Sequence, residues 1–236
     1  MSKVLLSLMF CLALVGAPSM RAEAAQPPRL VGLITATGDI VPAPRDACVP
    51  FPFRDEAGRR PDFVAFRERL LAAIDRRDVD AVVNVAVPDI RLSFGTSQGR
   101  DDLRRGLTAA PERWNALRTV LTLGGTWESS NVFTAPYVFS AWPDDHDSFE
   151  EQAIVGAHVR VRAAPRADAA VVTSLTSCIV RVAETREPNE DWTAVELGAQ
   201  AVGYVSSPYI RSPIDYRARF VFKGGRWQMD YFVAGD

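Results

Sequence analysis

The chain has 236 residues, of which 47% are hydrophobic and 24% are charged. This length and composition are typical of a globular protein with one large domain or two small ones, and they exclude collagen-like, coiled-coil and wholly disordered proteins. The formal net charge is −2. A nearly balanced charge without a basic cluster offers no electrostatic footprint for nucleic acid or for an anionic membrane surface.

The first 24 residues are predicted to be a cleavable secretory signal peptide. Lys3 provides a positive start, residues 4–17 are largely apolar, and Ala22-Glu23-Ala24 matches a small-x-small cleavage site. The apolar run is shorter than the roughly 20 residues that span a bilayer, which favours cleavage over a membrane anchor. Cys11 follows bulky residues, unlike the cysteine of a lipoprotein signal.

The mature protein is therefore expected to start at residue 25, to be periplasmic or secreted, and to have no membrane span. Cleavage removes Lys3, Arg21 and Glu23, which leaves a net charge of −3. No later segment is apolar enough to cross a bilayer.

Two cysteines, Cys48 and Cys178, remain after cleavage. In an oxidising compartment two cysteines often pair, and this bond would tie the N-terminal arm to the distal half of the chain. Alternatively, Cys178 is a small buried apolar residue between Ser177 and Ile179. Both interpretations stay open from the sequence.

Residues 25–61 are rich in proline and lack periodicity, which predicts an extended arm with one short strand near 30–34. Asp62 is expected to cap a helix that runs to Arg76 and has one apolar face, formed by Phe63, Phe66, Leu70 and Ile74.

The segment from Val79 to Val87 follows Asp78, ends before Pro88, and is so rich in valine that it fits either a helix or a strand. Residues 90–94 alternate apolar and polar side chains, which predicts a half-buried strand.

Two further helices are expected over 101–107 and over 111–123, the second ending at Gly124. Residues 62–125 thus form a helix-rich α+β part, and residues 126–152 are interpreted as a linker.

Beyond this linker the periodicity is that of short strands. We expect strands around Val155–Val161, Ala170–Ser174, Cys178–Ala183, Trp192–Leu197 and Val202–Val205. The terminal segment, 213–236, alternates on both sides of Gly224-Gly225, which predicts a β-hairpin. The predicted fold class is α+β.

Four motifs occur in order between residues 153 and 212. They are Val159-Arg160-Val161-Arg162-Ala163-Ala164-Pro165, Ala170-Val171-Val172-Thr173-Ser174-Leu175, Trp192-Thr193-Ala194-Val195, and Gly203-Tyr204-Val205 followed by Ser206-Ser207-Pro208-Tyr209-Ile210. In this order they resemble a bacterial SH3-like domain. The segment departs from that family at Ser177-Cys178, where glycine is frequent, and in a longer excursion at 184–191.

This resemblance implies a small, five-stranded, non-catalytic antiparallel β barrel that binds a cell-wall peptide or another protein in a groove lined by aromatic residues. By position, Trp192, Tyr204 and Tyr209 are the ligand-binding candidates. For Trp192 and Tyr204 the alternative is a place in the barrel core, because large aromatic residues of small domains are usually buried. Tyr209 is the best groove candidate.

The order of helices, strand and terminal hairpin around this segment resembles a second family, the cone-shaped α+β fold of the ketosteroid isomerase and nuclear-transport-factor type. In that arrangement the hairpin joins the N-terminal helices and the barrel is an insertion. Alternatively, the hairpin packs beside an appended barrel. No residue matches a catalytic motif of this family.

The segment Gly95-Thr96-Ser97-Gln98-Gly99 matches the G-x-S-x-G pattern of a hydrolase nucleophile, with His146 or His158 as the base. Against this interpretation, the helix that follows is highly charged, and the preceding strand alternates, whereas central parallel strands are continuously apolar. Ser97 remains a weak catalytic alternative.

The acidic run 144–147 lacks the spacing of a known calcium loop, and the two histidines and two cysteines form no local zinc motif. We therefore expect neither a metal nor a cofactor.

The expected function is that of an exported, non-enzymatic binding or accessory protein of the cell envelope. Its expected partner is a cell-wall peptide or an envelope protein, and not a nucleic acid. The alternatives are an envelope serine hydrolase that uses Ser97 and a purely structural or assembly role.

Overall fold

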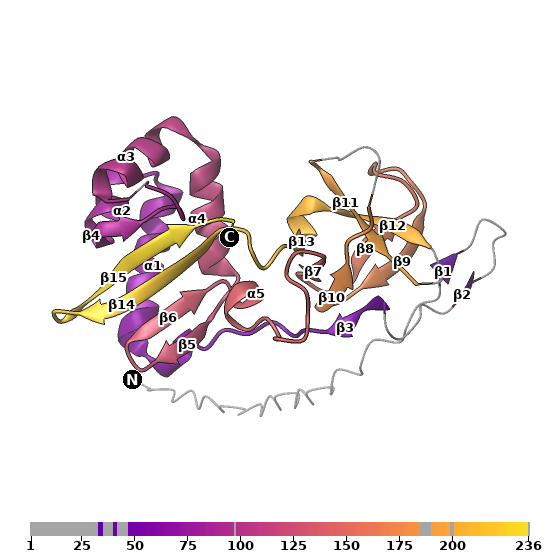
Figure 1. Cartoon of the computed structure of the whole chain (residues 1–236), viewed down its shortest axis with the longest axis horizontal. Coiled ribbons are helices and arrows are strands. Elements are labelled where there is room, and N and C mark those ends of the chain that lie inside the picture. Colours follow the sequence, from indigo (N-terminus) through magenta and orange to yellow (C-terminus); the bar gives the residue numbers. More distant parts are fainter. Residues whose placement is uncertain are drawn as a thin grey trace, which may run out of the picture.

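The computed structural model describes residues 33–34, 40–41, 47–96, 98–184, 190–198 and 201–235. They form two lobes that lie side by side (Figure 1). We call them the α+β lobe, with four helices on a five-stranded sheet, and the β lobe, with two four-stranded sheets. The predicted α+β fold class is confirmed. The predicted signal peptide lies outside the described residues, and none of the described helices is long and apolar enough to cross a membrane.

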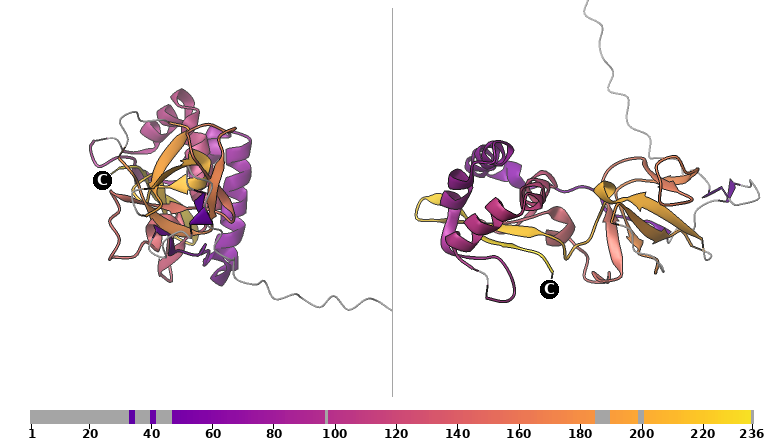
Figure 2. Two further views of the ribbon diagram at one scale, coloured as in Figure 1. Left: turned by 90° about the vertical axis from the view of Figure 1, so that its right-hand side faces the viewer. Right: turned by 90° about the horizontal axis from the view of Figure 1, so that it is seen from above.

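Four helices cover one face of the five-stranded sheet (Figure 2). They are α1 (Pro61–Asp75), α2 (Val79–Val85), α3 (Arg100–Ala109) and α4 (Glu112–Thr122). The prediction that Asp62 caps α1 is wrong, because Asp62 lies in the first turn of the helix. The helix begins at Pro61, and the first helical position suits proline because its amide would have no partner within the helix. Asp78 caps α2 by accepting a hydrogen bond from the amide of Ala81 at 3.0 Å.

The valine-rich segment is divided between a helix and a strand. Helix α2 ends at Val85, and β4 (Ala86–Arg91) begins at the next residue, so the strand expected at 90–94 starts earlier in the chain. Pro88 was expected to end the segment, but it lies inside β4. Proline is tolerated there because β4 is an edge strand. The guanidinium of Arg100 covers this edge by donating to the Ala86 carbonyl at 2.9 Å.

The terminal hairpin lies at the centre of the sheet. The other strands are β5 (Thr126–Ser129), β6 (Val132–Ala135), β14 (Arg217–Lys223) and β15 (Arg226–Val233), and the order is β4-β15-β14-β6-β5. The predicted two-glycine turn is confirmed: Gly224 and Gly225 have φ of 61° and 77°, which glycine adopts without strain. Because β14 pairs with β6 and β15 with β4, the hairpin belongs with the N-terminal helices.

The interpretation of residues 126–152 as a linker is wrong. This range contains β5, β6, the short helix α5 (Tyr137–Ser140) and the start of β7 (Glu151–Ile154). The strands β5 and β6 are short, and β6 lies in the sheet only through its pairing with β14, more than eighty residues later in the chain, so their local pattern is weak.

The core of the α+β lobe is aromatic. Phe63 of α1 is fully buried, and five rings surround it with centroids 4.4 to 5.9 Å away, those of Phe66, Trp127, Phe133, Phe220 and Trp227. Side chains from α1 and from the sheet therefore fill the space between the two layers.

The β lobe contains two packed antiparallel sheets. The first has the order β13-β7-β10-β3 and the second the order β11-β12-β8-β9. Their remaining strands are β3 (Val49–Pro50), β8 (Val159–Arg162), β9 (Val171–Leu175), β10 (Cys178–Arg181), β11 (Trp192–Glu196), β12 (Val202–Ser206) and β13 (Ile210–Arg211). The strands expected from Ala170 onward are confirmed to within about two residues. The strand expected around Val155–Val161 begins only at Val159, because a turn follows β7.

A single closed five-stranded barrel over residues 153–212 is wrong. Strands β3 and β7, which begin outside this range, pair with β10 on its two sides. The two sheets meet at one isolated bridge, between Val182 and Val195, and enclose a common apolar core. The barrel prediction failed because β3 is added from the N-terminal arm, far away in the sequence.

The N-terminal arm links the two lobes. Its strand β1 (Leu33–Ile34), predicted near this place, pairs with β2 (Ile40–Val41). A disulfide joins Cys48 to Cys178, which is one of the two interpretations that the sequence left open. After β3, the Phe51 ring packs on Tyr137 of α5 at 5.2 Å, in a buried cluster that also contains Ala153 of β7 and Ile179 of β10.

Candidate functional site

A hollow of about 510 Å³ opens on the β lobe. Trp192 and Tyr209, two of the three aromatic residues predicted to bind a ligand, line it together. Tyr209 is 52% exposed. Trp192, for which a core position was the alternative, is half-buried at the wall of the hollow. Tyr204 is not part of the lining; it lies within β12 and pairs with Ala194 of β11.

Backbone hydrogen bonds hold the two aromatic residues in place. Tyr209 ends the short 3-10 helix η3 (Ser207–Tyr209). At the start of η3, the amide of Ser207 donates to the Asp191 carbonyl at 2.9 Å and its hydroxyl donates to the Glu190 carbonyl at 2.7 Å. The Tyr209 carbonyl accepts from the amide of Val155 at 2.9 Å. The rim that carries Tyr209 is therefore fixed both to the start of β11, beside Trp192, and to β7.

The opposite wall of the hollow is basic. Along β8, Val159 and Val161 are buried in the core, while Arg160 and Arg162 lie on the other face of the strand, about 7 Å apart. Both arginines line the hollow, together with His158 just before the strand. From the sequence, this segment is interpreted through its alternating valines and its resemblance to the first strand of an SH3-like domain. The alternation of basic residues at 158, 160 and 162 is a further signal of the site, which neither interpretation uses.

The positive charge of this wall is only partly compensated. No aspartate or glutamate is among the described residues that line the hollow. The guanidinium of Arg162 donates to the Ala169 carbonyl at 2.6 Å, which fixes its position without neutralising it. Arg160 is exposed, and in the described part of the chain no carboxylate lies within ion-pair distance of it. The nearby Arg166, by contrast, is paired with Asp168 at 2.6 Å.

Two tight turns shape one end of the hollow. His158 has φ of 54° and Ser177 has φ of 42°, a left-handed conformation that costs non-glycine residues energy. The turns lock each other: the amide of His158 donates to Thr176 Oγ1 at 2.8 Å, and the amide of Ser177 donates to the Gly156 carbonyl at 2.9 Å. The approach to β8 is thus rigid.

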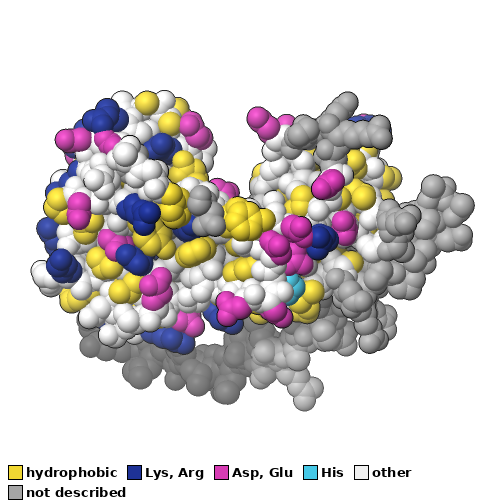
Figure 3. Space-filling view, in the orientation of Figure 1, with side chains coloured by type: hydrophobic (Ala, Val, Ile, Leu, Met, Phe, Trp, Pro, Cys, Tyr) yellow, Lys and Arg dark blue, Asp and Glu magenta, His cyan; other side chains and the backbone are white. Residues whose placement is uncertain are grey.

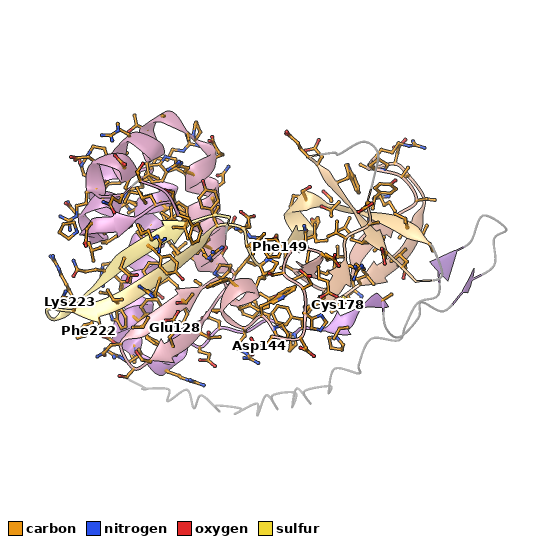
Figure 4. The ribbon with its side chains drawn as sticks, in the orientation of Figure 1. Glu128, Asp144, Phe149, Cys178, Phe222 and Lys223 are labelled. Carbon is orange, nitrogen blue, oxygen red and sulfur yellow. A yellow bond between two sulfur atoms is a disulfide. The ribbon has the colours of Figure 1, made fainter. Side chains whose placement is uncertain are left out.

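Of the residues named for the serine hydrolase alternative, His158 lines the hollow and Ser97 lies outside the described residues. His146 Nδ1 lies 2.8 Å from Glu151 Oε2, and the Trp142 indole donates to the His146 carbonyl at 3.1 Å. No group of three or more histidine, cysteine, aspartate or glutamate side chains suited to a metal ion is found among the described residues. Asp144 lies at the surface below the junction of the lobes (Figure 4).

A second polar cluster lies on the face of the five-stranded sheet opposite the helices. Arg219 forms two-pronged hydrogen bonds to Asp230, at 2.7 to 3.1 Å, and its guanidinium lies 4.9 Å from the Tyr231 ring centroid. Burial, followed by the negative charge of Glu128, raises the pKa of Tyr231. The Thr134 hydroxyl donates to Glu128. Because these groups bind one another, the cluster stabilises the sheet.

Charged side chains of both signs are intermingled over the face of the molecule that Figure 3 shows. This pattern agrees with the small net charge of the chain, −2.

Comparisons with known proteins give no family. No protein-family model matches the chain, and no curated protein matches it. Among solved structures, the chain is similar to an NTF2-like protein with a cystatin-like fold from Novosphingobium aromaticivorans, with 12% identity over 73% of this chain and 79% of that one and a TM-score of 0.29. It is also similar to a protein of unknown function from Mycobacterium tuberculosis, with 15% identity over 72% and 69% of the two chains and a TM-score of 0.25. TM-scores this low assign neither a fold family nor a function to this chain.

Proposed function

We propose that this chain is an exported binding protein that holds a peptide of the cell wall, or of an envelope protein, in the hollow of the β lobe. The observation that carries the proposal is the pair of aromatic residues at the hollow, Trp192 and Tyr209, on a backbone fixed by hydrogen bonds. Rigid aromatic side chains beside a concave surface are a common means of binding extended peptides, because they offer apolar area at little cost in conformational entropy.

The resemblance of residues 153–212 to bacterial SH3-like domains supports this choice of ligand. The quoted motifs coincide with β8, β9, β11 and β12. One departure from the family has a structural reason: Ser177 occupies a place where glycine is frequent, and its φ of 42° is the conformation that glycine adopts freely. The binding role itself is our proposal.

Export is supported by two independent features. The sequence predicts a signal peptide over residues 1–24, and a Cys48–Cys178 disulfide is compatible with an oxidising compartment outside the cytoplasm. A binding protein of the envelope meets cell-wall peptides in that compartment.

The environment of the hollow favours binding over a purely structural role. If the β lobe served only for internal packing, the N-terminal arm or the terminal hairpin would be expected to cover Tyr209. Instead, Phe51 and Phe53 pack on Tyr137, and the hairpin pairs with β4 and β6. None of these segments belongs to the described lining of the hollow.

The proposal is tested by sedimentation of the purified mature protein with isolated cell walls, and in parallel by capture on immobilised envelope extract. We expect Tyr209→Ala to weaken binding about tenfold, or about 1.4 kcal/mol, as for an aromatic residue at the centre of an interface. Phe149→Ala is the matched control, because Phe149 is also an exposed aromatic residue, 67% exposed, but lies outside the hollow near the junction of the lobes (Figure 4). No binding, or equal losses in both variants, would refute the proposal.

A further inference from the structure

The charge of the hollow restricts the chemistry of what it binds. Its described lining includes His158, Arg160 and Arg162 but no acidic side chain. A ligand with a positive charge in this hollow would meet at least two guanidinium groups without compensation. A ligand with a negative charge would form charge-assisted hydrogen bonds, which are about twice as strong as neutral ones.

We propose that the hollow recognises the carboxylate of an acidic peptide, and that Arg160 is the residue that binds it. This inference rests on the proposed function for the peptide nature of the ligand and adds its chemical class. Trp192 and Tyr209 hold the apolar part of the peptide, while the strand β8 presents Arg160 to the carboxylate. A planar guanidinium suits this role because its fork of N–H groups matches the two carboxylate oxygens.

Arg160 and Arg162 differ in their freedom to act. The Arg162 guanidinium is held at 2.6 Å by the Ala169 carbonyl, in the loop between β8 and β9, so it supports the wall of the hollow and adds positive charge. Arg160 pairs through its backbone with Ser174 of β9, and no described carboxylate lies within ion-pair distance of its side chain. Its donors are therefore available to a ligand.

A compact carboxylate fits the molecule better than a polyanion does. The mature chain has a net charge of −3, from the composition after removal of residues 1–24, and would repel an extended polyanion such as a nucleic acid. The positive wall is short: it follows one strand of four residues. One or two carboxylates of a peptide occupy a region of that size.

The test uses two peptides that differ only in charge, N-acetyl-Ala-Glu-Ala-amide and its glutamine counterpart. Each is titrated into the ¹⁵N-labelled mature protein, and the side-chain N–H signals of Arg160 and Trp192 are followed by NMR. We expect saturable shifts of both signals with the glutamate peptide, at least tenfold weaker binding of the glutamine peptide, and weaker binding of the glutamate peptide as the salt concentration rises.

Two variants test whether Arg160 causes the preference for the glutamate peptide. Arg160→Gln should abolish the preference for glutamate over glutamine. Arg166→Gln should retain it, because Arg166 is an exposed arginine of the same lobe that is paired with Asp168 and does not line the hollow. Thermal unfolding of both variants checks that they fold; Arg160→Lys, which keeps the charge, should keep part of the preference.

The outcomes separate this inference from the proposed function. Equal binding of the two peptides, absence of shifts at Arg160 with either, or displacement by inorganic phosphate more readily than by acetate would overturn the carboxylate assignment. Sedimentation with cell walls would still decide the proposed function. If cell walls were not bound but the glutamate peptide was, the carboxylate site would stand and the ligand would be sought among acidic envelope proteins.

Discussion

Replacement of Cys48 and Cys178 by alanine removes a cross-link between residues 130 positions apart in the chain. In the unfolded state, this bond closes a loop that contains all of α1 to α5 and β3 to β9. The chain-entropy relation for a loop of this length gives about 5 kcal/mol of stabilisation through the reduced freedom of the unfolded chain. That value is an upper figure, because engineered and native disulfides often contribute less than the relation predicts.

The other contacts of the N-terminal arm determine how much stability the double alanine variant keeps. Strand β3 has only two register pairs with β10, and the amide of Phe51 adds one hydrogen bond to the Ser177 carbonyl at 2.8 Å. The buried Phe51 ring still packs on Tyr137 and Trp142. We therefore expect the double variant to fold, with an unfolding free energy lower by about 2–5 kcal/mol, the range for native disulfides of small secreted domains.

The assay is urea unfolding of the oxidised wild type, the reduced wild type and the double alanine variant, followed by tryptophan fluorescence. The reduced protein and the variant should unfold at the same urea concentration, and both below the oxidised protein. Unfolding of all three at one midpoint would show that the bond does not restrict the unfolded chain. Loss of stability in the variant but not in the reduced protein would attribute the effect to lost packing at Cys178 instead.

Two further substitutions test the packing and the electrostatics of the lobes. In Gly203→Ala, the new methyl would lie 2.4 Å from Cγ1 of Val161 in the core of the β lobe. We therefore expect the unfolding free energy to fall by about 1–3 kcal/mol, as measured by urea unfolding. An unchanged urea midpoint would contradict this packing. Hydrogen bonds from Arg60 and Trp227 hold the pKa of Asp62 well below its usual range. The ionised carboxylate therefore contributes to the unfolding free energy at any pH above the ordinary aspartate pKa, and this contribution is lost as the pH falls through the lowered value. NMR titration of the Asp62 carboxyl should give this low midpoint and a higher one in Arg60→Gln; an ordinary midpoint in the wild type would refute the network.

Elements specified by neighbouring residues were predictable from the sequence. The terminal hairpin, which carries Phe222 and Lys223 at its far end (Figure 4), follows from alternation on both sides of two glycines, although a register shift at Arg219 and Phe220 interrupts the pattern. The helices α1 and α4 follow from their apolar spacing. The pairing of β3, a strand of two residues, depends on Cys178, far away in the chain, and on a bond that the sequence left open.

The candidate site was predictable only in part, for a similar reason. Resemblance to a family pointed to Tyr209 and Trp192, and the structure places both at one hollow. The alternation of His158, Arg160 and Arg162 is visible in the sequence, but its meaning is not. Basic residues on one face of a strand are usually ordinary solvent-exposed positions. They indicate a binding site when no acidic side chain lies near them, and only the folded lobe shows which side chains lie near.

The most direct test of the account is a map of backbone amide shifts in the ¹⁵N-labelled mature protein during titration with soluble peptide fragments of digested cell walls. The account predicts that the largest shifts cluster at residues 157–162, at Trp192 and at residues 206–209, which together surround the hollow. Shifts confined to α1–α4 and the five-stranded sheet, or no saturable shifts at all, would contradict the claim that the β lobe binds the peptide.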